Sequence, residues 1–281
     1  MEEAPGPLVD AAWLERNLGD PDLVVADVRW RPDGTAAKAF EEGHILGAVL
    51  VDVDRDLAAP AYEGPGRHPL PAPDVFAERM SALGIRNDAT VVAYDDASSS
   101  HAARLWWMLR VTGHRAFVLD GGLPAWPGHR VKGPPVERNR SRFLAQPWPH
   151  DRVAIAEDVE ELLQHGGTVL DARAPERYRA EQESIDKVAG HIPGARNAPF
   201  AENVDPVTQR FRSVDDLRAT FASVGADSEA AIVYCGSGLT ACQLVLSMEF
   251  AGLPSPRLYE GSWSDWITDE RRPVATGPDP G

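Results

Sequence analysis

The chain is built from two similar halves, and this duplication limits its fold more than any other feature. Residues 25–29 (VADVR) match residues 169–173 (VLDAR), and residues 44–48 (HILGA) match residues 191–195 (HIPGA). The offset is 144 residues for the first pair and 147 for the second, as expected when loops have been inserted since an old duplication. Two copies in 281 residues predict a tandem of two globular domains rather than a solenoid.

A proline-rich stretch near the middle of the chain separates the two halves. Residues 131–150 contain four prolines with polar residues between them. This composition is typical of an exposed, semi-extended linker. We therefore predict a first domain over residues 1–135, a linker over residues 136–150 and a second domain over residues 151–281.

Within each copy, short apolar runs alternate with helical patterns. In the second copy, residues 156–163 and 239–250 have helical patterns, whereas residues 168–170 and 232–234 are typical of short buried strands. Ser213 opens a further helix with acidic residues in its first turn. This alternation predicts an α/β fold in which each copy forms a parallel sheet with helices on both faces. In such sheets the active loop lies beyond the carboxyl end of a central strand.

One cysteine stands where such a loop would begin. Cys235 follows the apolar run 231–234 and precedes Gly236, Ser237 and Gly238, after which the helical pattern starts. The N–H groups of the loop and the positive end of the helix dipole favour a thiolate, which is the nucleophilic form of cysteine. A buried structural cysteine is the alternative. The glycines favour a reactive cysteine, because they let backbone amides approach the sulfur closely.

The residues after this loop narrow the chemistry. A cysteine phosphatase needs an arginine six residues after its cysteine to grip the phosphate, and this chain has Ala241 there. A loop of amides without a guanidinium suits one sulfur anion better than a phosphoryl dianion. The second cysteine, Cys242, lies inside the predicted helix and is interpreted as a packing residue rather than a resolving thiol.

The composition excludes several kinds of partner. The formal net charge is −15 and the basic residues form no stripe, so we expect no nucleic acid as a partner. No window of about eighteen apolar residues occurs, so we expect no membrane span. The start of the chain lacks the features of a signal peptide and the two cysteines fit a reducing compartment, which predicts a cytoplasmic protein. The repeated His44 and His191 are interpreted as structural, and no cysteine–histidine cluster has metal-ligand spacing.

Several motifs together resemble the rhodanese family of two-domain sulfurtransferases. Residues 43–48 (GHILGA) and 190–195 (GHIPGA) resemble its first signature in each copy, and residues 260–266 (EGSWSDW) resemble its C-terminal signature. The resemblance implies two tandem rhodanese-like domains with one catalytic cysteine, in the second. At the matching place the first copy has Asp95, which cannot hold a persulfide. The first domain is therefore expected to be non-catalytic.

The cysteine loop is similar to that of the 3-mercaptopyruvate group within this family. Residues 235–240 (CGSGLT) depart from that group in Leu239, where valine is usual. Thiosulfate-specific members usually have charged residues in this loop, and a loop without them suits a monoanionic donor better. The resemblance implies that Gly236, Gly238, Leu239 and Thr240 bind the substrate.

The resemblance also implies roles for side chains outside the loop. Asp54 and His68 fall where the 3-mercaptopyruvate group has an aspartate and a histidine, which implies a proton relay with Ser237 that runs from the first domain into the second. Surface loop residues without a catalytic role are the alternative. Arg177 matches the arginine that clamps the anionic end of the donor, whereas Arg173 is expected to pair internally.

One position departs from this group. Its members commonly have a second arginine shortly before the GHIP turn, and this chain has Ser184 there. Lys187 is a basic residue nearby, but it is three residues away. On this resemblance Lys187 is the alternative to the missing arginine, and Ser184 counts against 3-mercaptopyruvate as the preferred donor.

Taken together, these residues predict a sulfurtransferase that works through a persulfide on Cys235. The thiolate attacks the sulfur of a small anionic donor, preferably 3-mercaptopyruvate, and a thiol acceptor such as thioredoxin, or cyanide, then takes the sulfur. The resemblance implies neither a cofactor nor a metal. Two alternatives stay open. The first is a thiosulfate sulfurtransferase, which steady-state rates with both donors would distinguish. The second is a non-catalytic rhodanese-like binding or regulatory module.

Overall fold

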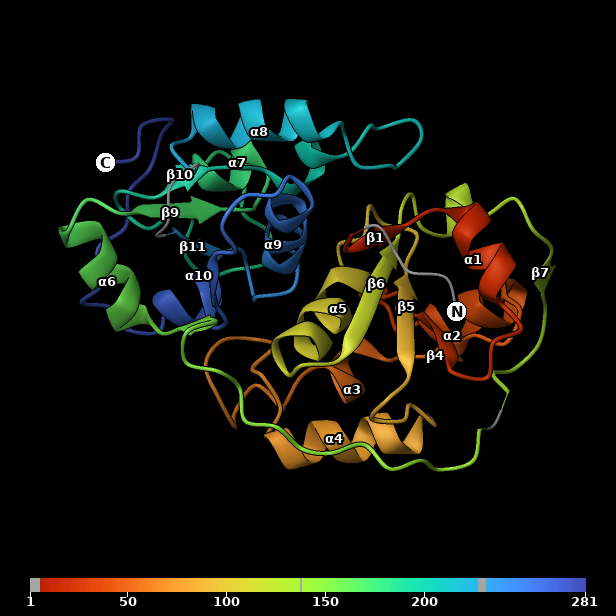
Figure 1. The fold of residues 1–281 in the computed structure, drawn as a ribbon. Coiled ribbons are helices and arrows are strands. Elements are labelled where there is room, and N and C mark those ends of the chain that lie inside the picture. The colour runs from red at the N-terminus through yellow and green to blue at the C-terminus, as the bar shows by residue number, and fades with distance from the viewer. Residues whose placement is uncertain (1–5, 137, 227–230) are drawn as a thin grey trace. The chain divides into compact units, whose positions relative to one another are not determined.

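The computed structural model describes residues 6–136, 138–226 and 231–281, which form two compact units (Figure 1). The first unit contains the described residues up to Ala58 together with Pro71–Trp148 and Asp205–Phe211. The second contains Ala59–Leu70, Pro149–Val204 and the described residues from Arg212 onward. Each unit is therefore one copy of the repeat, except for one short segment that comes from the other copy.

A five-stranded parallel sheet forms the centre of the first unit. Its strands lie in the order β1 (Leu8–Val9), β6 (Arg115–Leu119), β5 (Thr90–Tyr94), β2 (Leu23–Asp27) and β4 (Val49–Leu50). The central strands β2 and β5 are buried along their whole length, as expected for a parallel sheet covered on both faces. A separate antiparallel pair consists of β3 (His44–Ile45) and β7 (Arg130–Val131).

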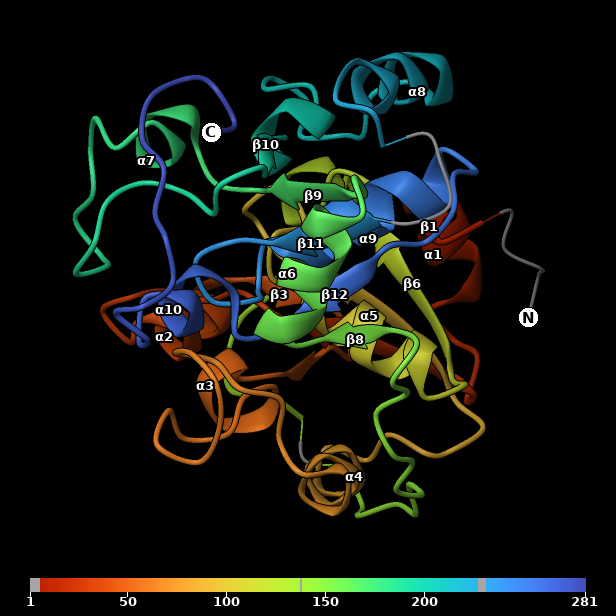
Figure 2. The same ribbon diagram turned by 90° about the vertical axis from the view of Figure 1, so that its left-hand side faces the viewer.

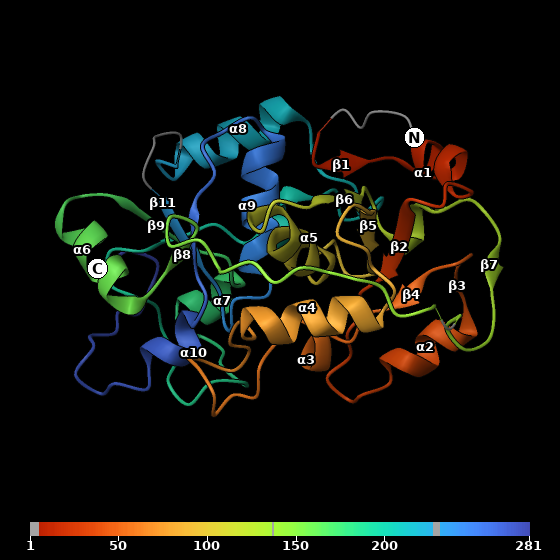
Figure 3. The same cartoon turned by 60° about the horizontal axis from the view of Figure 1, so that its bottom comes forward.

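Helices cover this sheet on both faces. They are α1 (Ala11–Asn17), α2 (Ala36–Glu42), α3 (Val53–Asp56), α4 (Pro73–Ala82) and α5 (Ala102–Val111), with a 3-10 turn, η1 (Leu123–Ala125). Val92 and Tyr94 of β5 pack with Trp13 of α1 and Phe40 of α2. The intervening residues of β5 point the other way, toward the face where α5 packs on β5 and β6. Helix α3 lies beside α4 (Figure 3).

The second unit repeats the same topology. Its strands lie in the order β8 (Val153–Ala154), β12 (Arg257–Tyr259), β11 (Ala231–Tyr234), β9 (Thr168–Asp171) and β10 (Arg196–Asn197), and every neighbouring pair is parallel. These strands correspond one by one, in chain order and in position, to β1, β6, β5, β2 and β4. The predicted parallel sheet is therefore present in both copies.

The helices of the second unit also lie on both faces of their sheet. They are α6 (Ala156–Gln164), α7 (Pro175–Tyr178), α8 (Val214–Ser223), α9 (Ala241–Phe250) and α10 (Ser262–Trp266), with a 3-10 turn, η2 (Phe200–Asn203). Val159 of α6 and Trp263 of α10 share one core with Tyr234, and Figure 2 shows α6 in front of the strands. Helix α9 packs on β11 and β12 and against α8. Among the described residues, every helix is too short or too polar to span a bilayer.

The two repeated histidines make the same contacts in their own units. His44 Nδ1 lies 2.9 Å from the carbonyl oxygen of Phe40, and the two rings stack with centroids 3.7 Å apart. His191 Nδ1 lies 2.8 Å from the carbonyl oxygen of Tyr178, and these rings also stack at 3.7 Å. Both histidines are buried. These contacts agree with a structural role, and the described residues contain no cluster of three or more side chains that could hold a metal ion.

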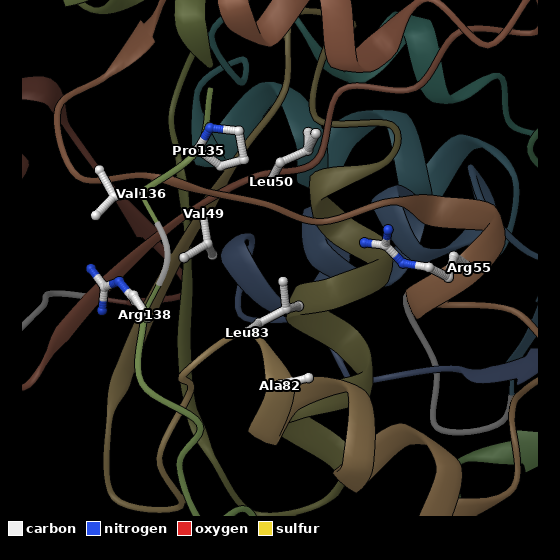
Figure 4. A pocket seen from close by; sticks show the side chains of 8 residues that line it. All are labelled: Val49, Leu50, Arg55, Ala82, Leu83, Pro135, Val136 and Arg138. Atoms are coloured by element: carbon white, nitrogen blue, oxygen red, sulfur yellow. The ribbon is translucent and has the colours of Figure 1, made fainter. Parts of the chain in front are cut away.

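The first unit also has a pocket of about 400 Å³ that contains none of the predicted site residues (Figure 4). Both of its arginines already have partners inside the unit. Arg138 donates to the carbonyl oxygen of Gly47 at 3.1 Å, and Arg55 forms an ion pair with Asp56 at 2.7 Å. The rest of the lining is apolar and consists of Val49, Leu50, Ala82, Leu83, Pro135 and Val136.

Candidate active site

Cys235 lies at the carboxyl end of β11, the middle strand of the second sheet. The loop that follows leads into α9, whose first residue is Ala241. The Cys235 side chain is buried, and the backbone N–H of Gly238 donates to its Sγ atom at 3.2 Å. The sulfur is thus placed at the strand end predicted for the active loop, with a backbone donor directed at it.

The C-terminal motif, residues 260–266, holds this loop in shape. The backbone N–H of Trp263 donates to the carbonyl oxygen of Cys235, and that of Ser264 donates to the carbonyl oxygen of Gly236, both at 3.0 Å. Gly238 has a φ of 79°, which favours glycine, and a Cβ at this position would collide with the carbonyl oxygen of Glu260. The glycine therefore permits the turn that directs its own N–H at the sulfur.

The remaining loop residues line the start of α9. Leu239 is 5 % exposed and Ser237 is 6 % exposed, and Thr240 occupies the N-cap position of the helix. Cys242 is fully buried in the first turn of α9, where its Sγ atom donates to the carbonyl oxygen of Gly238 at 3.4 Å. This position agrees with the interpretation of Cys242 as a packing residue.

A segment from the first half of the sequence, Ala59–Leu70, belongs to the second unit. The C-terminal motif holds this segment as well. Arg67 N–H donates to Ser264 Oγ at 3.1 Å, and Leu70 N–H donates to the Glu260 carboxylate at 2.9 Å. Gly66 has a φ of 74°, and a Cβ there would collide with the carbonyl oxygen of Gly261. The same motif therefore positions both the cysteine loop and this segment.

His68 and Ser237 are brought together by this arrangement. His68 Nδ1 lies 2.7 Å from Ser237 Oγ, although 169 residues separate them in the sequence. Asp54, the third residue of the predicted relay, lies on α3 in the first unit. There its carboxylate accepts a hydrogen bond from Trp30 Nε1 at 2.9 Å. The roles of these residues stay predictions, and the His68–Ser237 contact is the geometry that supports them.

Arg177 lies on α7 and is clamped by two buried carboxylates. Its Nε donates to Glu183 at 3.0 Å, and its Nη2 donates to Glu183 at 3.0 Å and to Asp186 at 2.7 Å. The side chains of Glu183 and Asp186 are only 4 % and 3 % exposed. Arg67 is also paired with Asp186, through its Nη1 atom. Ser184 and Lys187 are both exposed.

The pKa values of the two carboxylates are shifted in opposite directions. For Glu183, burial alone would raise the pKa, but the backbone amides of Asp186 and Ile185 and the Arg177 guanidinium bring its pKa below the ordinary value. For Asp186, burial raises the pKa above the ordinary value, against the opposing effect of Arg67 and Arg177.

Arg173 has an internal partner, as predicted. It forms an ion pair with Asp171 at 2.6 Å, and its guanidinium lies 4.7 Å from the ring centroid of Trp263. The equivalent pair in the first unit, Arg29 with Asp27, lies at 2.7 Å. The repetition of this pair in both copies indicates a structural role for Arg173.

The first unit has a carboxylate where the second has its cysteine. Asp95 follows β5, the counterpart of β11, and is buried. Its two carboxylate oxygens accept four backbone hydrogen bonds at 2.8–3.0 Å, from the N–H groups of Ala97, Ser99, His101 and Ala102. The loop amides that would surround an external anion are thus occupied by the side chain of the loop itself.

Sequence reasoning missed Arg67, Glu183 and Asp186. The two carboxylates stand in an irregular stretch without periodicity, so no pattern identifies them as buried. Arg67 directly precedes His68, and that adjacency was the available signal. This adjacency indicates a place in the site only when residues 59–70 are known to lie beside the cysteine loop.

Comparison with known proteins gives consistent matches over both halves of the chain. The model of the rhodanese-like domain matches residues 10–129 and 155–269. A Pseudomonas aeruginosa protein named "Probable 3-mercaptopyruvate sulfurtransferase" is 43% identical over 96% of this chain and 98% of its own length. The thiosulfate sulfurtransferase of Rattus norvegicus is 35% identical over 92% of this chain and 91% of its own.

A solved structure shows the same similarity in three dimensions. The crystal structure of SseA, a 3-mercaptopyruvate sulfotransferase from Escherichia coli, superposes with a TM-score of 0.82 at 33% identity. The superposition covers 92% of this chain and 99% of that protein.

Proposed function

The chain belongs to the rhodanese family and is a sulfurtransferase, and on that premise we propose that it takes sulfur from 3-mercaptopyruvate through a persulfide on Cys235. The observation that favours this donor is the contact between His68 Nδ1 and Ser237 Oγ. Ser237 follows Cys235 by two residues in the sequence. Removal of pyruvate from the sulfur requires a proton transfer, and these two side chains can perform it beside the nucleophile.

The first half of the reaction loads the cysteine. The Cys235 thiolate forms a bond to the thiol sulfur of 3-mercaptopyruvate while the carbon–sulfur bond of the donor breaks. The electron pair of that bond leaves with the enolate of pyruvate. The proton of the donor thiol passes through Ser237 and His68 to carbon 3, which yields pyruvate and the anionic persulfide. The Gly238 N–H, which donates to Sγ, supports stabilisation of the sulfur anion.

The second half of the reaction empties the cysteine. A dithiol acceptor such as reduced thioredoxin reduces the persulfide. The outer sulfur leaves as hydrogen sulfide, the acceptor becomes a disulfide, and the Cys235 thiolate is regenerated. Cyanide takes the same atom as thiocyanate. We expect this half-reaction in the cytoplasm, because a reducing compartment keeps both Cys235 and the acceptor in the thiol form.

The charges around the loop also favour 3-mercaptopyruvate over thiosulfate. The loop itself is neutral, and the charges of Arg67 and Arg177 are balanced by those of Glu183 and Asp186. A monoanion needs less excess positive charge than a dianion. We therefore expect kcat/KM for 3-mercaptopyruvate to exceed that for thiosulfate by about tenfold or more. Steady-state kinetics with both donors and one acceptor measures the ratio, and a preference for thiosulfate would favour the alternative function.

The two copies have different tasks in this proposal. The nucleophile belongs to the catalytic domain, residues 151–281, which the linker 136–150 joins to the first domain, residues 1–135. The first domain is non-catalytic in that it has no nucleophile, although its segment 59–70 supplies His68. The carboxylate of Asp95, which accepts four backbone hydrogen bonds, supports this division, because it offers no nucleophile.

The Asp95→Asn variant tests this division. Asparagine keeps the shape of the side chain, but its NH₂ group faces two backbone donors that then lack an acceptor. We expect the free energy of unfolding of the first unit to fall by about 2–4 kcal/mol, while kcat at saturating donor changes less than about threefold. Urea denaturation, monitored by hydrogen exchange of the peptides around β5, measures the stability of the first unit. A folded Asp95→Asn protein that had lost turnover would instead assign the Asp95 loop a catalytic part.

A further inference from the structure

An indole N–H holds the carboxylate of Asp54, the aspartate of the predicted relay. The Oδ2 atom of Asp54 accepts a hydrogen bond from Trp30 Nε1 at 2.9 Å. Asp54 lies on α3, a single turn of helix, and its side chain is exposed. An exposed carboxylate on so short an element can adopt several rotamers. A hydrogen bond to one oxygen selects one of these rotamers and so gives the carboxylate a fixed direction.

The indole of Trp30 is in turn packed against a second ring. The Trp30 and His101 rings have centroids 5.4 Å apart at an interplanar angle of 37°. Burial lowers the pKa of the His101 imidazole, against the opposing effect of Asp95 and Asp96. The imidazole is therefore neutral at pH 7, and it does not compete with the indole as a cationic partner for Asp54.

The backbone of Trp30 is anchored as well. Arg31 Nη1 donates to the carbonyl oxygen of Trp30 at 2.9 Å, and the same guanidinium forms an ion pair with Asp96 at 2.5 Å. Trp30 follows β2, whereas Asp96 and His101 lie between β5 and α5. Two separate connections of the first unit thus fix the indole that holds Asp54.

The second copy of the repeat shows that the fold does not require this group. The strand registers align the copies at offsets of 144 residues for β2 and β9, 147 for β4 and β10, and 140 for β5 and β11. Helix α3 and the turn η2 also begin at an offset of 147. At these offsets the positions of Trp30, Asp54 and His101 are occupied in the second copy by Ala174, Ala201 and Ala241.

Contacts that serve the fold recur in both copies instead. The buried aspartate–arginine pair after β2 is repeated after β9, and the histidine ring stack is repeated in the second unit. The group of Trp30, Asp54 and His101 is present in the first copy as a set and absent from the second as a set. A role outside the common fold explains this difference.

We propose that Trp30 is a positioning residue for Asp54 in the proton relay, and that His101 holds the indole in place. The inference rests on the proposed function and goes beyond it by naming the side chains that give the relay aspartate its direction. In this role Trp30 and His101 act through Asp54 rather than on the sulfur donor.

The test begins with the indole N–H. Trp30→Phe removes this donor and keeps an aromatic ring beside His101. We expect kcat for 3-mercaptopyruvate to fall by about tenfold and KM to change less than about twofold, because the relay acts in the chemical step. The kcat/KM for thiosulfate should change less than about twofold. The matched control is Trp148→Phe, which removes an indole N–H bonded to the carbonyl oxygen of Pro71 at 2.8 Å and should leave both donors within about twofold.

A double variant shows whether the indole acts through the carboxylate. If it does, Trp30→Phe/Asp54→Ala should lose no more kcat with 3-mercaptopyruvate than Asp54→Ala alone. A tryptophan that only stabilises the first unit would instead add its own loss to that of Asp54→Ala.

His101 is tested by substitution and by a signal that does not depend on turnover. His101→Ala should lower kcat for 3-mercaptopyruvate by about 3–10-fold, and His101→Phe, which keeps a ring, should restore it to within about twofold of the wild type. The NMR resonance of the Trp30 indole N–H should shift in Asp54→Ala and in His101→Ala and stay in place in Trp148→Phe. A resonance that does not respond to Asp54→Ala would show that the indole does not hold the carboxylate.

Failure of the inference and failure of the proposed function give different results. If Asp54→Ala loses turnover while Trp30→Phe behaves like Trp148→Phe, the relay stands and the inference is wrong. Equal losses with both donors in Trp30→Phe would assign the indole a structural role and overturn the inference too. A wild type that 3-mercaptopyruvate does not load at Cys235 contradicts the proposed function, and the relay and its positioning residues are then overturned together.

Discussion

Replacing Cys235 by serine should abolish persulfide formation and lower the rate of sulfur transfer by about 10³-fold or more. A serine hydroxyl at this position cannot accept a sulfane sulfur, and no other thiol in the sequence except Cys242 could replace it. Cys242 is fully buried within α9, and its Sγ atom donates to a backbone carbonyl, which is an environment for a thiol rather than a thiolate. Cys242→Ser should therefore keep most of the activity.

The two cysteine variants serve as controls for each other. Each removes one sulfur atom, each changes a buried side chain, and Cys242→Ser reports how much of any loss comes from disturbed packing. Mass spectrometry after incubation with 3-mercaptopyruvate should find one added sulfur in the wild type and in Cys242→Ser, and none in Cys235→Ser. A persulfide on Cys242 in the Cys235→Ser protein would disprove the assignment.

Local pattern was enough to predict the fold, and it led to the prediction of Cys235 as the nucleophile. The predicted strand at 232–234 lies within β11, the predicted helix at 156–163 corresponds to α6, and Ser213 caps α8 by accepting from the N–H of Asp216. The family model and the solved structure confirm two tandem rhodanese-like domains. These features depend on periodicity and on turn residues, which are properties of neighbouring positions in the chain.

Contacts between distant segments could not be predicted in the same way. Residues 59–70 join the second unit although they lie within the first copy in sequence, and residues 205–211 join the first unit although they lie within the second copy. The buried carboxylate of Asp186 pairs with Arg67, 119 residues away. No periodic pattern encodes such a pair, because its stability comes from two charges that meet only after the chain has folded.

The His68–Ser237 pair should matter far more for one donor than for the other. Departure of pyruvate as an enolate requires proton transfer, whereas sulfite leaves thiosulfate without needing a proton. We therefore expect His68→Ala and Ser237→Ala each to lower kcat/KM for 3-mercaptopyruvate by about 10²–10⁴-fold, and for thiosulfate by less than about tenfold. Steady-state kinetics with both donors on the same enzyme preparations gives this comparison, and the exposed His165 of the second unit provides the control variant His165→Ala.

A double variant distinguishes a relay from two independent contacts. If the proton passes through both side chains, removal of either one interrupts the same path, so His68→Ala/Ser237→Ala should lose little more than the worse single variant. If the two side chains contributed independently, the fold losses in kcat/KM of the two single variants would instead multiply in the double variant. Equal losses with both donors would show that His68 packs against the loop or contributes charge rather than moving a proton. The 2.7 Å separation of Nδ1 and Oγ would then be a structural contact, and the preference for 3-mercaptopyruvate would need another cause.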